Sequence, residues 1–197
     1  MGKSLPLTLE LGSLLGSLSL LALLVLVGQP LAQHQGQSPG VDEERAQLLT
    51  LLRDEQLREH EPERVAKAIE RIGDLRSVDD IEDLIKLLTF SRNIQKEIIG
   101  DTIVGEHFIT PFARYPAAGA LFRIGKPSLP GLMGVIRTED TASLASENAL
   151  YTLMQIFRDA PSQGVEYLKE AATGEPSPEA ARGLSIAAEK MKRFVHQ

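Results

Sequence analysis

Apolar residues recur along this chain at the spacing of an α-helix. From Asp42 onward they fall repeatedly at positions i, i+3, i+4 and i+7, which places each set along one side of a helix. No convincing run of alternating apolar and polar residues competes with this pattern, so it predicts an all-α domain. The complete sets lie at residues 65–72, 81–88, 117–124, 129–136, 150–157 and 184–191, with a weaker set at 165–172.

Proline and capping residues mark where these helices are expected to begin. Pro62, Pro127 and Pro161 each stand where a new helix starts, since a proline in the first turn loses no amide hydrogen bond. Ser77, followed three residues later by Asp80, resembles a capping box with Asp in place of the usual Glu. The neighbouring acidic pair, Asp79 and Asp80, would also complement the dipole of a helix that starts there.

Two glycines are expected to end helices, and the helices are expected to pair. Gly73 and Gly125 directly follow apolar stripes, where a left-handed capping residue is wanted. Short connections of this kind favour antiparallel packing of successive helices. Residues 65–88 and 117–136 share one layout of helix, Arg-Ile-Gly stop and second helix, and residues 148–172 repeat it more loosely. Helices at about 41–60 and 178–195 would cover the two ends.

Residues 117–136 carry the most specific pattern in the chain. It reads A-x-x-A-L-x-x-I-G-x-P-x-L-P-x-L, formed by Ala117, Ala120, Leu121, Ile124, Gly125, Pro127, Leu129, Pro130 and Leu132. This pattern resembles HEAT-type repeats, especially the short bacterial variety also found in phycobilisome-lyase-type proteins. The resemblance covers about residues 62–191. It implies a short α-solenoid of about three antiparallel helix pairs with flanking capping helices.

The first residues have the order of an export signal. Lys3 precedes an uncharged, apolar run at residues 11–27, and the small residues Gly28 and Ala32 follow. A basic start, an apolar middle and small residues at the end are typical of a secretory signal peptide. We therefore expect a signal peptide at residues 1–32. An uncleaved membrane anchor formed by residues 11–27 is the alternative that the sequence leaves open.

These features predict the domain organisation and the compartment. The polar stretch at residues 33–41 contains Gly36, Pro39 and Gly40 and has no helical periodicity, which is typical of a flexible linker. Residues 42–197 then form the helical domain. With either a cleaved signal or an anchor, this domain is expected outside the cytoplasmic membrane, in the periplasm or the extracellular space.

Composition narrows the function classes. The net charge is −6, and Lys and Arg are interspersed with Asp and Glu, so the sequence shows no basic face of the kind that binds nucleic acid. The chain has no Cys, which excludes disulfides, thiolate metal sites and thiol nucleophiles. Hydrophobic residues make up 43% of the chain, enough to bury a core that packing alone holds together.

The helical pattern lapses in an insertion at about residues 89–115. This stretch is rich in β-branched and aromatic residues and holds five polar or aromatic candidates for binding: Asp101, Glu106, His107, Arg114 and Tyr115. One interpretation is a short helix and a loop whose Ile and Phe residues fill a gap between repeats. The other is a binding edge at the mouth of a concave face, because long irregular connections often carry function.

Catalytic and metal-binding patterns are missing from the sequence. No H-E-x-x-H arrangement places two imidazoles on one helical face, and no phosphate-binding glycine loop or G-x-S-x-G elbow occurs. We therefore expect no enzyme, no metal and no cofactor. The alternative is an envelope enzyme, a lyase or hydrolase, with a site near residues 89–115 that is centred on His107.

The leading hypothesis is an exported binding or scaffold protein whose partner is a protein or peptide. The HEAT resemblance implies that the second helix of each pair lines a concave surface, at about residues 127–137 and 161–173. The contact residues expected there are Arg137, Gln163, Glu166 and Lys169. Contact with a membrane is expected only through an uncleaved N-terminal segment. The sequence does not indicate an oligomeric state.

Overall fold

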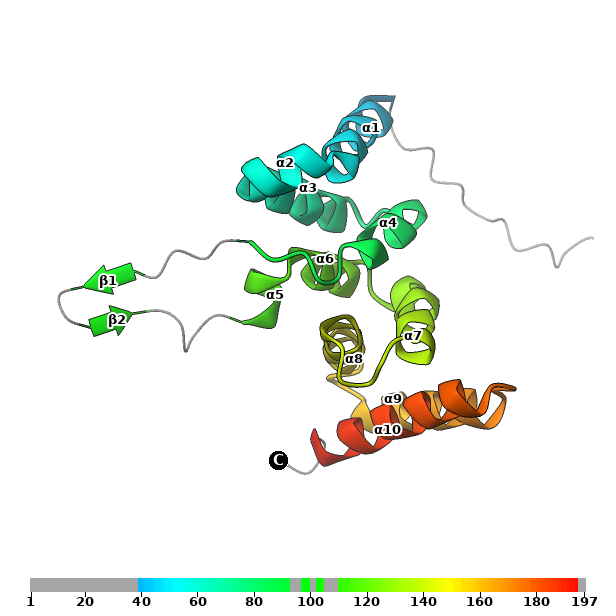
Figure 1. Cartoon of the computed structure of the whole chain (residues 1–197). Coiled ribbons are helices and arrows are strands. Elements are labelled where there is room, and N and C mark those ends of the chain that lie inside the picture. The colour runs from blue at the N-terminus through cyan, green and yellow to red at the C-terminus, as the bar shows by residue number, and fades with distance from the viewer. Residues whose placement is uncertain (1–38, 93–96, 100–101, 105–109, 195–197) are drawn as a thin grey trace, which may run out of the picture. The chain divides into compact units, whose positions relative to one another are not determined.

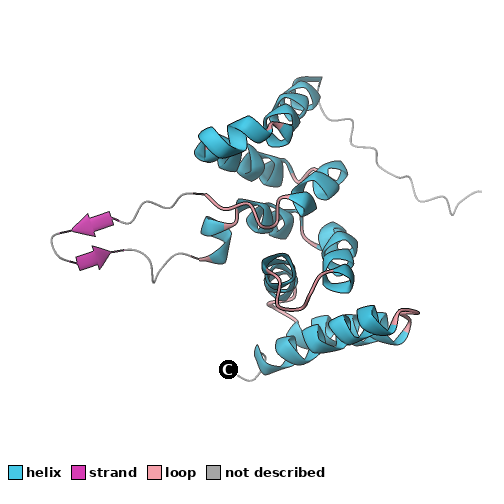
Figure 2. Cartoon of the chain, in the orientation of Figure 1, coloured by secondary structure: helices cyan, strands magenta, loops and turns pink. Residues whose placement is uncertain are grey.

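The fold is all-α, as the periodicity predicts. The computed structural model describes residues 39–92, 97–99, 102–104 and 110–194, and Figure 1 and Figure 2 show its helices. The α-helices are α1 (Pro39–Arg53), α2 (Glu55–His60), α3 (Pro62–Leu75), α4 (Ile81–Lys86), α5 (Pro111–Arg114), α6 (Pro116–Ile124), α7 (Leu129–Thr138), α8 (Leu144–Ile156), α9 (Pro161–Thr173) and α10 (Pro178–Phe194). Short 3₁₀ turns, η1 (Val78–Asp80) and η2 (Lys126–Ser128), precede α4 and α7.

The chain divides into two units, residues 1–37 and 38–197, and the helices belong to the second. The expected signal peptide at residues 1–32 and residues 33–38 of the expected linker lie outside the described residues. Residues 39–41 belong to the first turn of α1, so the expected end of the linker at residue 41 is wrong. None of the helices that the structure describes combines the length and apolar character needed to cross a lipid bilayer.

The insertion contains a small antiparallel sheet that the sequence analysis did not predict. Strand β1 (Glu97–Ile99) pairs with β2 (Thr102–Val104), with Ile98 opposite Ile103. Both strands consist mostly of β-branched residues, which favour extended backbone, and Gly100 lies between them in the sequence. Each strand is only three residues long, too short for a search for alternating patterns to detect.

The prediction of one N-terminal helix at residues 41–60 is wrong. Two helices, α1 and α2, occupy this region, and Asp54 separates them with an extended backbone. The Asp54 carboxylate accepts a hydrogen bond from the amide of Leu57 at 3.1 Å. Asp54 is therefore the N-cap of α2, and this local bond competes with a continuous helix.

The two glycines expected to end helices behave differently. Gly125 follows α6 with a positive φ of 83°, but its ψ of −140° lies outside the left-handed helical region, so it ends the helix in a different glycine conformation from the expected one. Gly73 is instead buried inside α3, and the left-handed residue is Arg76, with a φ of 50°. A Cβ atom on Gly73 would lie 2.6 Å from the Cα atom of Ala120. Gly73 is therefore required by the close approach of α6, and its prediction as a cap is wrong.

The expected capping box at Ser77 is also wrong. Ser77 precedes η1, but its side chain makes no capping hydrogen bond. The Asp80 carboxylate instead accepts hydrogen bonds from the guanidinium of Arg45 on α1, at 2.7–3.0 Å. Asp80 is only 1% exposed, so this contact ties α1 to the start of α4. The sequence analysis gave Asp79 and Asp80 one shared role, at the positive end of a helix dipole. The structure gives Asp80 a different one, as the buried partner of Arg45.

One hydrophobic core runs from α1 to α10. It is built mainly from Leu, Ile and Ala, and its largest fully buried side chains are Leu52, Ile69, Ile72, Leu84, Leu88, Leu121, Leu132, Met133, Ile136, Leu153, Leu168 and Leu184. Nearly all of these positions belong to the apolar stripes read from the sequence. The periodicity therefore identified the buried face of most helices.

The helices contact one another in an order that differs in part from the predicted pairs. The closest packing is between α9 and α10 and between α3 and α6, followed by α7 with α8. Helix α8 packs more closely on α6 and α7 than on α9, and Figure 1 shows α9 beside α10. None of the three expected pairs is a close contact: α8 meets α9 only weakly, and the contacts of α3 with α4 and of α6 with α7 are weaker still. The main neighbours of α3 and α9 are instead α6 and α10, so the helices within residues 65–88, 117–136 and 148–172 do not pair as the sequence predicts.

Candidate binding cleft

Helix α5 stands at the end of the insertion and is fixed by an aromatic cluster. The Thr110 side chain accepts a hydrogen bond from the Ala113 amide at 3.3 Å, which caps this short helix. The Phe112 ring stacks on Phe122 of α6, with ring centres 5.1 Å apart, and meets Tyr151 of α8 edge-on at 5.1 Å. These contacts hold α5 against both α6 and α8.

The two ends of the insertion are joined at its base. The backbone amide of Arg92 donates a hydrogen bond to the carbonyl oxygen of Arg114 at 3.1 Å. The Arg92 guanidinium in turn donates to Glu70 of α3 at 2.7 Å. The bond between Arg92 and Arg114 therefore joins the segment after α4 to the C-terminal end of α5.

Helix α8 presents one side to α5. Its N-cap is Ser143, whose hydroxyl accepts a hydrogen bond from the amide of Ser146 at 3.1 Å. Leu144, Glu147, Asn148 and Tyr151 follow at the spacing i, i+3, i+4 and i+7, so they share one side of the helix. The apolar stripe at residues 150–157 lies on a different side and packs into the core.

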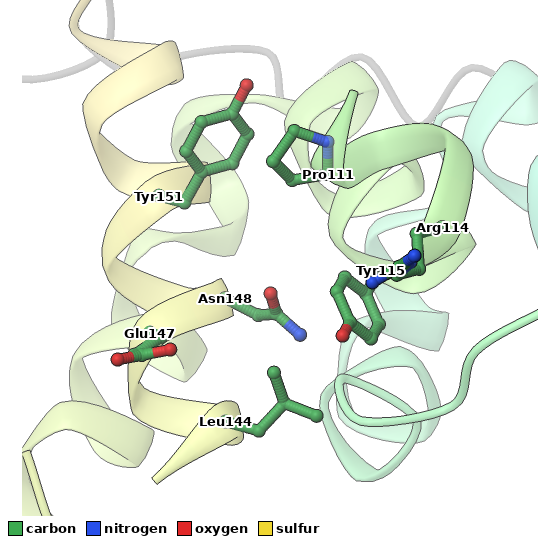
Figure 3. Close-up of a pocket in the computed structure, with 7 residues that line it drawn as sticks. All are labelled: Pro111, Arg114, Tyr115, Leu144, Glu147, Asn148 and Tyr151. Atoms are coloured by element: carbon green, nitrogen blue, oxygen red, sulfur yellow. The ribbon is translucent and has the colours of Figure 1, made fainter. Parts of the chain in front are cut away.

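A cleft of about 410 Å³ lies between α5 and this side of α8. Figure 3 shows its lining: Pro111, Arg114, Tyr115, Leu144, Glu147, Asn148 and Tyr151. Asn148 lies between the rings of Tyr151 and Tyr115, while Glu147 and Arg114 are on opposite sides. The cleft thus combines apolar ring and aliphatic surface with an amide, a carboxylate and a guanidinium.

Asn148 has a fixed orientation in the floor of the cleft. It is only 5% exposed, and its Nδ2 donates a hydrogen bond to the carbonyl oxygen of Leu88 at 2.8 Å. A carbonyl oxygen can only accept, so the nitrogen must face Leu88 and the oxygen Oδ1 must face the other way. Among the described residues no donor reaches Oδ1, and this atom is not closed off from solvent. The cleft therefore offers a fixed hydrogen-bond acceptor.

The structure brings two of the predicted insertion residues into this cleft. Arg114 and Tyr115 both line it. Asp101, Glu106 and His107 lie outside the described residues. Within the described ranges, no group of His, Asp and Glu side chains is arranged to hold a metal ion.

The predicted contact residues on α7 and α9 do not line the cleft. Arg137 is half-buried and forms an ion pair with Glu175, with 2.8 Å between Nε and Oε2, so it joins α7 to the segment between α9 and α10. Gln163, Glu166 and Lys169 are exposed along α9. The structure therefore gives Arg137 a packing contact and leaves the other three on an open helix surface.

Sequence reasoning missed the four cleft residues on α8. Their signal was present, because Leu144, Glu147, Asn148 and Tyr151 form a second stripe at helical spacing. In the sequence alone, a stripe of mixed polar and apolar residues cannot be distinguished from the solvent-exposed side of an ordinary helix. Only the position of α5 identifies it as the wall of a cleft. The hydrogen bond from Asn148 to Leu88 is equally invisible in sequence, since 60 residues separate them.

Two further hollows lie between α2 and α4 and share Arg58, Lys86 and Leu87. Their cations are already engaged within the protein. Arg58 donates to the carbonyl oxygen of Leu52 at 3.0 Å, and Lys86 pairs with Glu82 at 3.2 Å. The cleft between α5 and α8 is the stronger candidate because it holds an oriented, unsatisfied acceptor.

Comparison with known proteins found no protein-family model, no curated protein and no solved structure that matches this chain.

Proposed function

We propose that this chain is a binding or scaffold protein that holds a protein partner in the cleft between α5 and α8. The observation that carries the proposal is the buried Asn148 side chain, whose Oδ1 opens on the cleft without a partner among the described residues. Because Oδ1 is open to solvent, water can hydrogen-bond to it in the free protein. A ligand donor would replace that water with a direct hydrogen bond to an acceptor whose orientation is already fixed.

The size and surroundings of the cleft support a binding role. Its volume, about 410 Å³, falls in the range of roughly 300–1,000 Å³ that is typical of ligand pockets. Leu144 is 40% exposed at the rim, so it offers apolar surface to a partner next to the cleft. Tyrosine rings, which line the cleft here, are enriched where proteins bind one another.

The proposal includes a compartment and an architecture. The signal-like order of residues 1–32 supports export to the periplasm or the extracellular space, with an anchor at residues 11–27 as the alternative. Sequencing the N-terminus of the mature protein separates the two, because a cleaved signal leaves a start near Gln33. The contacts of α3 with α6, of α6 with α8 and of α4 with α7 support a short HEAT-like stack.

Site-specific photo-cross-linking tests the binding role. Benzoylphenylalanine replaces Leu144 at the cleft rim in the full chain, expressed in its native cells. We expect a covalent adduct with a distinct partner protein, because the new ring points from a position that a bound partner would cover. The same residue placed at Gln163 tests the alternative surface on α9, and Ser185, exposed on α10, is the control.

The pattern of adducts decides between the surfaces. An adduct from Leu144 and none from Gln163 or Ser185 supports the cleft. An adduct from Gln163 alone would move the binding surface to α9. Equal labelling at all three positions, or none at any, would contradict the proposed binding role.

A further inference from the structure

The walls of the cleft make three separate demands on an occupant. Asn148 Oδ1 requires a hydrogen-bond donor, and the rings of Tyr115 and Tyr151 beside it require an apolar group. Leu144 at the rim extends the apolar wall toward solvent. A donor and an apolar group within a few ångströms of each other are what a peptide backbone N–H and its own side chain supply.

The third demand is electrostatic. Glu147 is exposed at the cleft and has no ion-pair partner among the described residues. Arg114, the cation of the lining, lies on the opposite side of the cleft in Figure 3. The whole chain carries a net charge of −6, so its field attracts cations. A positively charged group beside Glu147 is therefore favoured over a negative one.

From these demands we infer that the cleft binds an extended peptide segment of the partner, in which a bulky aliphatic residue is followed by Lys or Arg. The aliphatic side chain lies against Tyr115, Tyr151 and Leu144, and its backbone N–H donates to Asn148 Oδ1. The basic side chain lies against Glu147. This inference rests on the proposed binding function and specifies the chemistry of its ligand.

Three fluorescein-labelled peptides test the inference on the full chain. The first is Gly-Ser-Gly-Leu-Arg-Gly-Ser-Gly, the second has Glu in place of Arg, and the third has Ser in place of Leu. Fluorescence anisotropy measures their affinity. We expect the Leu-Arg peptide to bind with a dissociation constant on the order of 0.1–1 mM, as suits so short a segment. Both substituted peptides should bind at least about fivefold more weakly.

A charge reversal at the rim supplies the decisive comparison. Glu147→Lys should weaken the Leu-Arg peptide about fivefold and strengthen the Leu-Glu peptide, since an exposed ion pair contributes up to about 1 kcal/mol. Glu189→Lys on α10 is the matched control. It makes the same change at an exposed helix position outside the cleft and should leave all three affinities unchanged.

Two variants that each remove an exposed apolar side chain test the apolar part of the inference. Leu144→Ser should weaken the Leu-Arg peptide about threefold to tenfold through lost apolar contact. Val78→Ser removes a large exposed side chain at a position outside the cleft and should have no effect. Both positions are exposed, and circular dichroism should show an unchanged helix content.

The outcomes separate this inference from the binding function itself. A preference for Leu-Arg that Glu147→Lys reverses supports the inference. If the Leu-Glu peptide binds equally well, or if no peptide binds at millimolar concentration while Leu144 still cross-links to a protein, the ligand chemistry is wrong and the binding function stands. If peptide binding and cross-linking both fail, the two proposals fall together.

Discussion

At the scale of single residues, small side chains decide how closely the helices approach. Gly73 of α3 faces Ala120 of α6, and a Cβ atom there would come within 2.6 Å of backbone. The sequence shows a glycine directly after an apolar stripe. Two different roles explain a glycine there: it can end the helix, or it can let a second helix pack closely. The distinction depends on the distance to α6, which only the fold supplies.

Gly73→Ala should therefore destabilise the protein. The added methyl group must push backbone of α6, at a cost of about 1–3 kcal/mol, and the gain in helix propensity offsets about 1 kcal/mol of this. Chemical unfolding of the full chain measures the difference. Gly134→Ala in α7 is the matched control, because nothing lies within 4 Å of its added Cβ. Gly134→Ala should leave the free energy of unfolding unchanged or raise it slightly. Equal free energies of unfolding for the two variants would contradict the close contact between α3 and α6 at Gly73.

At the scale of elements, charge pairs attach α1 to the rest of the domain. Glu44 pairs with Arg71, Arg45 with Asp80 and Arg53 with Asp83, each at 2.7 Å. The hydrogen bond from Arg71 lowers the pKa of Glu44, so this pair stabilises the fold above the ordinary pKa of the carboxyl and is lost as the pH falls through the lowered value. The hydrogen bond to Asp80 raises the pKa of Arg45, so Arg45 keeps its charge over the pH range in which Glu44 titrates.

Asp80→Asn should loosen α1 more than any surface substitution. Asp80 is 1% exposed and Arg45 is about a quarter exposed. Removing the buried carboxylate leaves Arg45 without its main partner, and we expect a loss of about 3 kcal/mol in the free energy of unfolding. Compared with the unsubstituted protein, the rate of amide hydrogen exchange should increase most in α1.

Asp79→Asn provides the matched comparison on the same element. The Asp79 side chain is 78% exposed and lies 3.3 Å from the same guanidinium. Its loss should cost less than about 1 kcal/mol, as exposed ion pairs do. Similar losses from both substitutions would show that burial of Asp80 does not strengthen the contact.

At the scale of the whole molecule, the sequence predicted where the helices lie in the chain better than it predicted which helices pack against each other. Apolar spacing identifies the side of a helix that is buried, but several helices with equivalent stripes can exchange partners. This is why the core positions were largely predicted and the packing of α9 on α10 was not. The cleft shows the same limit: Arg114 and Tyr115 were candidates, whereas the residues of α8 needed the position of α5.

The helical domain should fold without the residues before it. The core begins at Leu52 of α1, and residues 1–37 form a separate unit. A chain that starts at Pro39 should show the same cooperative thermal transition as the full chain, within a few degrees, by circular dichroism. A large drop in the transition temperature would mean that the N-terminal residues pack on the domain.

The hydrogen bond between Arg92 and Arg114 gives the insertion an unusual independence. Its ends meet at one anchored point, and closing a longer loop adds only about 0.6 kcal/mol for each doubling of length. Evolution can therefore lengthen, shorten or exchange the part of this segment that precedes α5 while the helices, α5 included, keep their packing. Helix α5 is the last part of this closed segment, so sequence inserted before Thr110 would be next in the chain to the cleft residues Pro111, Arg114 and Tyr115.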